Sequence, residues 1–458
     1  MSTPTQLETA PPASTAYADR FRCIGSACED TCCAAWTVPV DRATWDKYQA
    51  LPESPLRVLI QASVTRTPES AEPADDGKPP LFAKILMNEA NHCPILTSEG
   101  LCRIQAELGE SLLSHTCATY PRVVLAVGPA RETALTLSCP EAARLVLLSP
   151  DLLSPALLSP DLPMPAAPAG AASQHDSPAA EAPADFWSIR QAVLALIRNR
   201  TYPLWQRLFL LDLLCRRLDS IAQGELSRSV PAFLTDFDAT VASGALRPAM
   251  DKLPVDRTAQ LDVVLRLAGM MLQKSIVKPR FVECVKAFTA GIGNGPGATL
   301  ESLTAHYSFA HDRHFAPFFA RHPHMLENLL VNAIVRRQFP FGPHGMHAAA
   351  TVDRTHEFAL LAAQFVLMRG LLIGVAGHHG QAFSAPHVVH TVQAATKHFE
   401  HHPEFLTLAH ELLVERGMDG ARGLAILLRN AEVPAGADGA SPATPARPAP
   451  ASEAGRSA

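Results

Sequence analysis

Apolar residues recur at helical spacing through the second half of the chain. In residues 187–200, Ile189, Val193 and Leu196 lie three or four positions apart, a spacing that predicts one apolar face of an amphipathic helix. The next stretch repeats this pattern, and together these segments predict helices at 187–200, 201–222, 258–276, 279–290, 324–338, 355–376, 388–399 and 404–429. No convincing alternation of apolar and polar residues occurs there. We therefore expect residues 186–432 to form an all-α domain.

The most apolar stretch runs from residue 358 to residue 377 and is long enough to span a bilayer. It carries Gln364 and Arg369 near its middle, and an arginine at that depth is costly in hydrocarbon. We therefore expect a buried core helix, and no membrane partner.

Four stretches have compositions that bury little apolar surface, because they are rich in Ala, Pro, Ser or charged residues. They are residues 1–16, 62–80, 149–185 and 433–458. We predict a disordered N-terminus, a small domain at 17–148 with a flexible insertion at 62–80, a disordered linker, the helical domain and a disordered tail. The expected fold class is mainly α.

Composition limits the possible binding partners and the cellular compartment of the protein. The 458 residues are 47% hydrophobic, with a formal net charge of −5 and a pI near 6.4. A globular protein is expected, without the broad basic field that attracts nucleic acid. The first 19 residues lack the apolar run of a secretory signal, so we expect a cytoplasmic protein.

Cysteines gather in the first third of the chain, where they are Cys23, Cys28, Cys32, Cys33, Cys93, Cys102, Cys117 and Cys139. In a reducing cytosol such crowding indicates metal binding rather than disulfides. The two groups of thiols can converge across the intervening insertion, because loop closure becomes costlier only slowly with length. Cys215 and Cys284 stand alone in helical sequence, and we expect them to be small buried hydrophobes.

The cysteine pattern leaves the metal open. Four thiolates suffice for an iron–sulfur cluster or for zinc, so eight allow two centres or one centre with spare thiols. Adjacent Cys32 and Cys33 would strain the backbone if both bound one ion, so we expect one of them to face elsewhere. A structural zinc site that holds a poorly cored domain together is the main alternative to a cluster.

Several segments resemble the flagellin lysine-N-methylase family and its wider relatives with zinc- or iron-chelating cysteine clusters. They are FRCIGSACEDTCCAAWTVPVDRATWDKY, CPILTSEGLCRIQAELGESLLSHTCATYPR and LSCPEAARLVL, together with residues 189–214 and 326–342. The resemblance covers most of the chain outside the predicted linkers and tail.

This resemblance implies an enzyme that transfers a methyl group from S-adenosylmethionine to lysine ε-amines of flagellin in the cytoplasm, before export. It places the metal ligands among the eight N-terminal cysteines. For the bound group we expect an iron–sulfur cluster of the 4Fe-4S type, with zinc as the alternative. Tyr120, Pro121 and Arg122 follow Cys117 in the family's C-x2-YPR element. They could form a turn beneath the metal or contact the substrate. The rival function is a non-catalytic protein that stores, delivers or senses metal.

The sequence assigns neither a methyl-donor pocket nor a catalytic base. No glycine-rich turn joins a strand to a helix, and the glycines of residues 374–380 follow an apolar helix, which predicts a helix terminus. Radical chemistry would explain a cluster in a methylase. However, Cys28-x3-Cys32-Cys33 differs from the usual C-x3-C-x2-C spacing, so attack by a deprotonated lysine stays open.

Other polar residues of the helical region have ordinary structural interpretations. His387 and His390 could share a helical face, but without a familiar metal motif we expect surface or capping histidines. We interpret Arg336 and Arg337 as a solvated helix face. For the neighbouring pair of residues, Glu327 and Asn328, a capping or interhelical hydrogen bond is expected.

Overall fold

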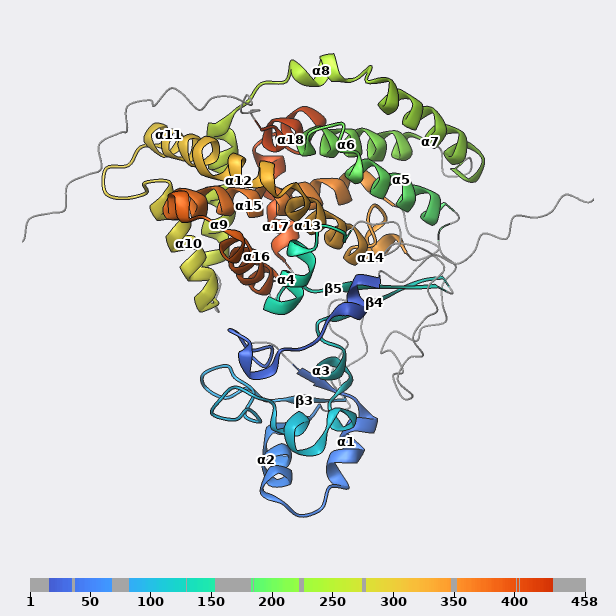
Figure 1. Cartoon of the computed structure of the whole chain (residues 1–458). Coiled ribbons are helices and arrows are strands. Elements are labelled where there is room, and N and C mark those ends of the chain that lie inside the picture. Colours follow the sequence, from blue (N-terminus) through green and yellow to red (C-terminus); the bar gives the residue numbers. More distant parts are fainter. Residues whose placement is uncertain are drawn as a thin grey trace, which may run out of the picture.

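The protein is mainly helical, as expected (Figure 1). The computed structural model describes residues 16–34, 38–67, 82–128, 130–152, 183, 185–221, 226–273, 277–346, 352–400, 402 and 404–430. The predicted tail at 433–458 lies outside these residues, as do residues 1–15 and most of the predicted linker and insertion. The predicted domain boundaries stay a prediction.

A small three-stranded sheet and three helices form the lower part of the molecule in Figure 1. The antiparallel order is β1–β3–β2, with both Val38 and Val64 opposite Ile85. The elements of this first stretch of chain are η1 (Ala16–Arg20), η2 (Gly25–Ala27), β1 (Val38–Val40), α1 (Arg42–Gln49), α2 (Pro55–Ser63), β2 (Val64–Arg66), β3 (Ala83–Ile85), η3 (Ile104–Leu108), η4 (Glu110–Leu112) and α3 (His115–Thr119). Of these, η1 does not belong to the lower part, because its Tyr17 and Ala18 are buried in the core of the helical body. Ser63 and β2 thus occupy the start of the predicted insertion at 62–80.

A hairpin and one helix connect this part to the helical body. The elements are β4 (Arg122–Val127), β5 (Ala130–Leu135) and α4 (Pro140–Leu148). Two asparagine side chains of one body helix form hydrogen bonds with the backbone of the hairpin and of α4. The Asn332 side-chain amide donates to the carbonyl of Leu135 at 2.9 Å, and the Asn328 amide donates to the carbonyls of Val146 and Ser149 at 2.8 and 2.7 Å.

The helical body surrounds one long buried helix, α15. Its described elements are α5 (Phe186–Arg198), α6 (Leu204–Ser220), α7 (Leu226–Ser243), α8 (Arg247–Asp251), α9 (Arg257–Leu272), α10 (Pro279–Gly291), α11 (Leu300–Ala310), η7 (His311–Phe315), α12 (Ala316–Arg321), α13 (Pro323–Arg336), α14 (Gly342–Gly345), α15 (Arg354–His379), η8 (Gly380–Ala382), α16 (Ala385–Phe399), α17 (Phe405–Glu415) and α18 (Ala421–Leu428). Within the described chain, the segment Arg354–Ala382 is long and apolar enough to cross a bilayer, but 94% of its most apolar window is buried inside the protein. The expected buried helix is confirmed.

Close contact between α10 and α15 depends on small residues. A Cβ atom at Gly291 would lie 1.8 Å from the carbonyl oxygen of Gly374, and one at Gly374 would lie 2.3 Å from the Phe288 ring. Gly374 and Gly377 are therefore packing positions inside α15. Gly380, with a φ of 57°, is the C-cap, so the expected helix terminus falls at the end of this segment.

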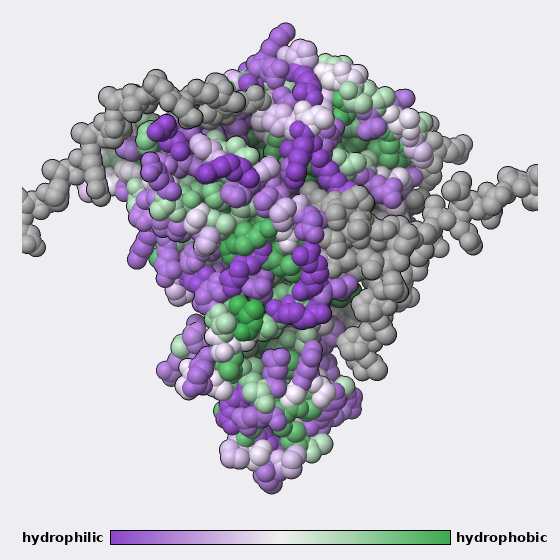
Figure 2. Space-filling view, in the orientation of Figure 1, coloured by the Kyte–Doolittle hydropathy of each residue, from purple (hydrophilic) through white to green (hydrophobic). Residues whose placement is uncertain are grey.

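Two hydrophobic cores lie in the described chain. The small one joins the β1–β3–β2 sheet to α1 and α2, and Cys93 is among its buried residues. The large one fills the helical body and includes Tyr17, Phe21 and residues of β5 and α4. The surface shown in Figure 2 is largely hydrophilic, with apolar surface gathered near the junction of the lower part and the body.

One predicted helix is wrong. The expected helix at 404–429 is interrupted, because α17 ends at Glu415 and α18 begins only at Ala421. Between them Gly417 has a φ of 63°, a left-handed conformation that ends a helix at little cost only for glycine.

Candidate metal centre

Five of the eight N-terminal cysteines line one cavity of about 60 Å³. They are Cys32, Cys33, Cys93, Cys102 and Cys117. The sulfurs of Cys32 and Cys33 lie 3.8 Å apart, so both neighbours face the same cavity. The expectation that one of them faces elsewhere is wrong.

Backbone hydrogen bonds bring the cysteine loops together. The N–H of Cys93 donates to the carbonyl of Cys33 at 2.8 Å, and the N–H of Arg103 donates to the carbonyl of Ile95 at 3.0 Å. Cys117 lies in α3, where the N-cap Ser114 hydroxyl accepts its N–H at 3.3 Å. Three segments that are far apart in sequence are therefore held around one space.

Burial sets the protonation of these thiols. It raises the pKa of Cys93 and Cys102, and it raises the pKa of Cys117 to about 12, with neighbouring thiolate charges acting in the same direction. The hydrogen bond from Cys33 instead lowers the pKa of Cys32, with a smaller contribution from the Lys397 ammonium. A bound cation would reverse the preference of the buried thiols for their protonated form, because it stabilises the thiolates.

The other three predicted ligands, Cys23, Cys28 and Cys139, are not among the residues that line this cavity. Burial is the largest cause that raises the pKa of Cys28 and of Cys139. The charge of Cys23 adds a small part to the rise at Cys28, and the charge of Cys28 adds to the rise at Cys139, so the three thiols lie near one another. The eight thiols thus divide into five around the cavity and three beside it.

The residues present fit a thiolate-bound metal group, although they do not converge on a point. Within the described residues, no three Cys, His, Asp or Glu side chains stand in position to coordinate a single ion. The five thiols instead surround a space, and soft sulfur ligands of this kind suit zinc or an iron–sulfur cluster. Which of the eight bind metal stays a prediction.

In the C-x2-YPR element, the tyrosine lies in the cavity wall and the arginine makes structural contacts elsewhere. Tyr120 lines the thiol cavity, and its hydroxyl lies 3.2 Å from the Ser138 hydroxyl. The Arg122 guanidinium donates to the carbonyl of Phe21 at 3.0 Å and lies over the Phe21 ring. This arrangement favours the interpretation of Arg122 as a structurally paired residue.

A polar chain next to the cavity was missed by sequence reasoning. The Ser138 hydroxyl lies 2.8 Å from that of Thr136, which donates to the Glu400 carboxylate at 2.6 Å. Thr136 and Ser138 stand just before Cys139, so their position beside a predicted ligand was the available indication. Glu400 follows the last residue of α16 and carried no comparable indication.

A second link joins α16 to the cysteine loop. The Lys397 ammonium donates to both oxygens of the Asp30 carboxylate at 2.8 Å and to the carbonyl of Thr31 at the same distance. The Gln393 amide donates to Asp30 and to the carbonyl of Ser138, also at 2.8 Å. The loop that carries Cys28, Cys32 and Cys33 is thus fastened to the helical body.

The candidate pair on α13 has the expected structural role. The carboxylate of Glu327 is fully buried and accepts from the guanidinium groups of Arg200 and Arg207 at 2.7 and 2.8 Å. Asn328 binds the carbonyls at the end of α4. These contacts confirm interhelical hydrogen bonding.

Arg336 and Arg337 do not form a solvated face, and that prediction is wrong. The Arg336 guanidinium pairs with Glu400 and that of Arg337 pairs with Glu357, each at 2.7 Å. Their side chains are 31% and 14% exposed. Both line a second cavity, which the apolar periodicity of the helix alone could not indicate.

The remaining candidates agree with their structural interpretations. The ring of His387 bonds to Ser384 in a capping box at the start of α16. His390 contacts the guanidinium of Arg280 at 3.0 Å. Cys215 and Cys284 are 0% and 2% exposed, which confirms that they are small buried residues.

The fold and the site define a mainly helical protein with a thiol-lined cavity at the side of its helical body. A family model described as the FliB lysine N-methylase C-terminal domain matches residues 190–427, which is just over half of the chain. The chain belongs to the FliB lysine N-methylase family.

Curated relatives support the same family. The chain is 33% identical over 136 residues to a lysine-N-methylase of Salmonella typhimurium, a match that covers 30% of this chain and 32% of that protein. It is 32% identical over 136 residues to the flagellar biosynthetic protein FliU of Salmonella muenchen, covering 30% of this chain and 76% of that protein. The matched region thus spans about a third of the length of the lysine-N-methylase. No solved structure matches the chain.

Proposed function

We propose that this protein is a protein-lysine N-methyltransferase that transfers a methyl group from S-adenosylmethionine to lysine ε-amines of flagellin. The observation that carries the proposal is the family match over residues 190–427. The names of the relatives, a lysine-N-methylase and a flagellar biosynthetic protein, support the reaction and the substrate. The proposed compartment is the cytoplasm, where reduced thiols persist.

The net reaction is a transfer of one methyl group and the loss of one proton. The lysine ammonium gives up a proton, a C–N bond forms to the methyl carbon, and the S–CH3 bond breaks. The products are methyl-lysine and S-adenosylhomocysteine. A lysine in water has a pKa near 10.4, so the reaction needs either a nearby base that takes the ammonium proton or an apolar slot that lowers the lysine pKa.

We further propose that the thiol cavity holds an iron–sulfur cluster. A single zinc ion needs four sulfurs that converge at about 2.3 Å from one point, whereas the five thiols surround a cavity of about 60 Å³. A cluster of several iron and sulfide ions suits such a space better. When bound, it would supply one-electron chemistry. Of the chain's own groups, Tyr120 and Ile95 line the same cavity and would shield part of a bound group from water.

The test compares two cysteine variants in one experiment. Cys117→Ser replaces a soft thiolate at the cavity by a hard, poorly ionised hydroxyl, whereas Cys215→Ser changes a buried thiol on α6 in the helical body. Anaerobically purified protein should contain iron and sulfide, which Cys117→Ser loses and Cys215→Ser keeps. Mass spectrometry of flagellin from cells with each variant should find methyl-lysine only with the unmodified chain and Cys215→Ser.

Each result separates the proposals. Protein that carries only zinc after anaerobic preparation would overturn the cluster while leaving the thiol site. Unmethylated flagellin from cells that express the unmodified protein would overturn the substrate. If a metal is bound and no protein lysine is methylated, the chain is instead a non-catalytic metal protein that stores, delivers or senses metal.

A further inference from the structure

The thiol cavity takes its wall from segments that are supported in different ways. Cys93, Cys102 and Cys117 belong to the small core or pack against it. Cys32 and Cys33 lie in the cysteine loop, residues 28–33, which belongs to no described helix or strand. The end of this loop is joined to the lower part by the hydrogen bond from the Cys93 N–H to the Cys33 carbonyl. The position of the Cys32 thiol therefore depends on what holds the rest of the loop.

The rest of the loop is held by α16 of the helical body. The Lys397 ammonium binds both oxygens of the Asp30 carboxylate and the carbonyl of Thr31, the residue directly before Cys32. Gln393 also donates to Asp30, and because it stands four residues before Lys397, both side chains lie on one face of the helix. This face of α16 thus contacts the backbone next to a cavity thiol without lining the cavity itself.

Burial decides which contact of the loop is the strong one. The side chains of Lys397 and Asp30 are 10% and 14% exposed. The Glu29 carboxylate of the same loop pairs with Arg144 of α4, but these side chains are 38% and 31% exposed. An exposed ion pair contributes little, because water and salt screen it. A buried carboxylate that loses its partner stays desolvated, so the Lys397 contacts should hold the loop more strongly.

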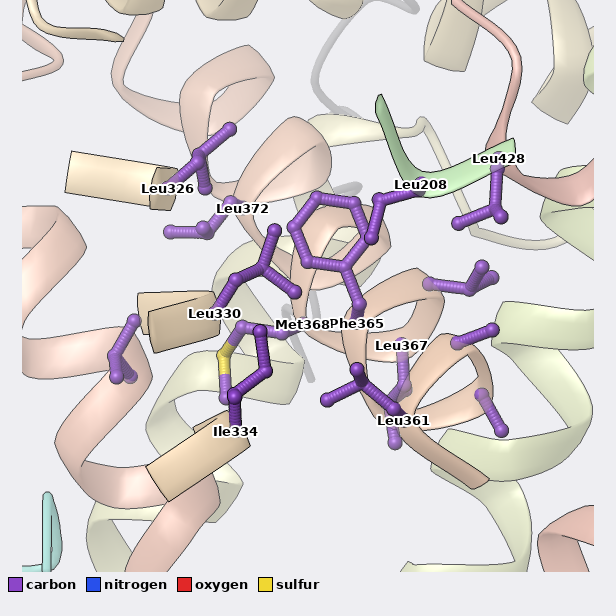
Figure 3. Packing of buried hydrophobic residues seen from close by; sticks show 14 of the residues in the cluster. Leu208, Leu326, Leu330, Ile334, Leu361, Phe365, Leu367, Met368, Leu372 and Leu428 are labelled. Atoms are coloured by element: carbon purple, nitrogen blue, oxygen red, sulfur yellow. The ribbon is translucent and has the colours of Figure 1, made fainter. Parts of the chain in front are cut away.

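The helix that carries Lys397 is firmly supported. It lies on the side of the helical body that faces the lower part (Figure 1), and it places Val392 and Phe399 in the large core. Figure 3 shows part of that core, with Leu330 of α13 beside Phe365 and Met368 of α15, a helix against which α16 packs. A side chain on a packed helix fixes its partner more precisely than one on a loop.

We propose that Lys397 is a positioning residue for the metal centre. By binding Asp30 and Thr31 it holds the Cys32 and Cys33 thiols at the cavity before metal binds, so the loop is not ordered at the expense of metal affinity. The helical body then sets how tightly metal is held while its α16 supplies no thiol to the cavity. This inference rests on the proposed metal group in the cavity and is independent of the methylated substrate.

The test uses the full-length protein and two variants at the contact. Lys397→Met removes the ammonium and keeps an unbranched side chain, and Asp30→Asn removes the charge from the other partner. Arg354→Met is the matched control, because the pair of Arg354 and Asp219 is similarly buried, at 6% and 23% exposure, and joins α15 to α6 away from the cavity. Thermal unfolding checks that each variant is folded.

The first measurement needs no metal. Hydrogen–deuterium exchange of the reduced, metal-free protein should be faster in residues 28–33 of Lys397→Met than in the unmodified protein. Exchange in α3, which carries Cys117, should be unchanged. Arg354→Met should leave both segments unchanged. This readout reports the position of the loop and not the stability of the whole protein.

The second measurement follows the loss of metal. Anaerobic protein reconstituted with ferrous iron and sulfide is mixed with an iron chelator, and the release of iron is timed. Lys397→Met should release iron roughly 10- to 100-fold faster, the effect expected for loss of a hydrogen bond to a charged group. Asp30→Asn should change the rate in the same direction, and Arg354→Met should release iron at the unmodified rate. For a protein that binds only zinc, the same rates are measured with a zinc chelator.

The outcomes separate this inference from the proposed metal site. If folded Lys397→Met and Asp30→Asn retain metal as long as the unmodified protein does, or if the loop exchanges no faster, only this inference fails. An equal acceleration in Arg354→Met would also overturn it, because the effect would then be a general loss of stability. An unmodified protein that binds neither iron nor zinc after reconstitution would overturn the metal site and this inference together.

Discussion

Replacing Glu327 by glutamine tests whether this buried carboxylate holds the helical body together. Glu327 is fully buried and lies between Arg207, 6% exposed, and Arg200, 53% exposed. Glutamine keeps the shape but removes the charge. The Arg207 guanidinium is then left buried without a counterion.

The magnitude follows from the two arginines. Breaking a buried ion pair costs about 3–5 kcal/mol, because the remaining charge stays desolvated. Arg207 also donates to the carbonyls of Tyr202 and Ile197 at 2.7 Å, which places the cost near the lower end, at about 3 kcal/mol. The mostly exposed Arg200 should contribute less than about 1 kcal/mol.

The assay is urea denaturation of the unmodified protein, Glu327→Gln, Arg200→Gln and the double variant Glu327→Gln/Arg207→Met. The double variant should recover part of the loss, because it removes the unpaired charge as well. A loss below about 1 kcal/mol for Glu327→Gln, or an equal loss for Arg200→Gln, would refute this reasoning. So would a folded Glu327→Gln protein that no longer methylates flagellin, since that result would give Glu327 a role in the reaction.

Two further predictions concern packing and acid stability. Gly291→Ala should destabilise the protein by several kcal/mol, because its Cβ would overlap the carbonyl of Gly374. Gly269→Ala is the control in α9, where no atom lies within 4 Å of the new Cβ, and it should stabilise the protein by about 0.5–1 kcal/mol. Thermal unfolding compares the two variants. Burial lowers the pKa of His398 to about 4, so between about pH 6.5 and pH 4 the unfolded chain binds a proton that the folded chain refuses. Stability should then fall by about 1.4 kcal/mol per pH unit as pH decreases, and urea midpoints should show a shallower decline for His398→Gln.

Apolar periodicity predicted much of the helical body. The expected helices at 187–200 and 355–376 correspond to α5 and α15, because each has a strong apolar face or is apolar all round. Periodicity failed at α11, whose sequence LESLTAHYSFA has few large apolar residues and begins with a Thr299–Ser302 capping box. Local hydrogen bonds at a cap are a weaker pattern than a row of leucines.

The sequence predicted the chemistry of the candidate site, which is thiol ligation, but not which of the cysteines lie together. Cysteine crowding pointed to thiol ligands, but no spacing rule separates Cys117, which lines the cavity, from Cys139, which does not. That difference arises from tertiary contacts, since Cys117 lies in α3 whereas Cys139 is the N-cap of α4 in the larger core. Arg336 and Arg337 were misread for a related reason. Arginines on a helix suggest solvent until the glutamates of other helices are known.

Helix α16 connects the two cavities through neighbouring residues. Thr396 lines the second cavity, and the Lys397 ammonium binds the Asp30 carboxylate of the cysteine loop. Glu400, one turn further along the chain, accepts from Thr136 and pairs with Arg336. The last turn of α16 and the residue that follows it therefore fasten two segments to the helical body, the cysteine loop through Asp30 and the segment after β5 through Thr136.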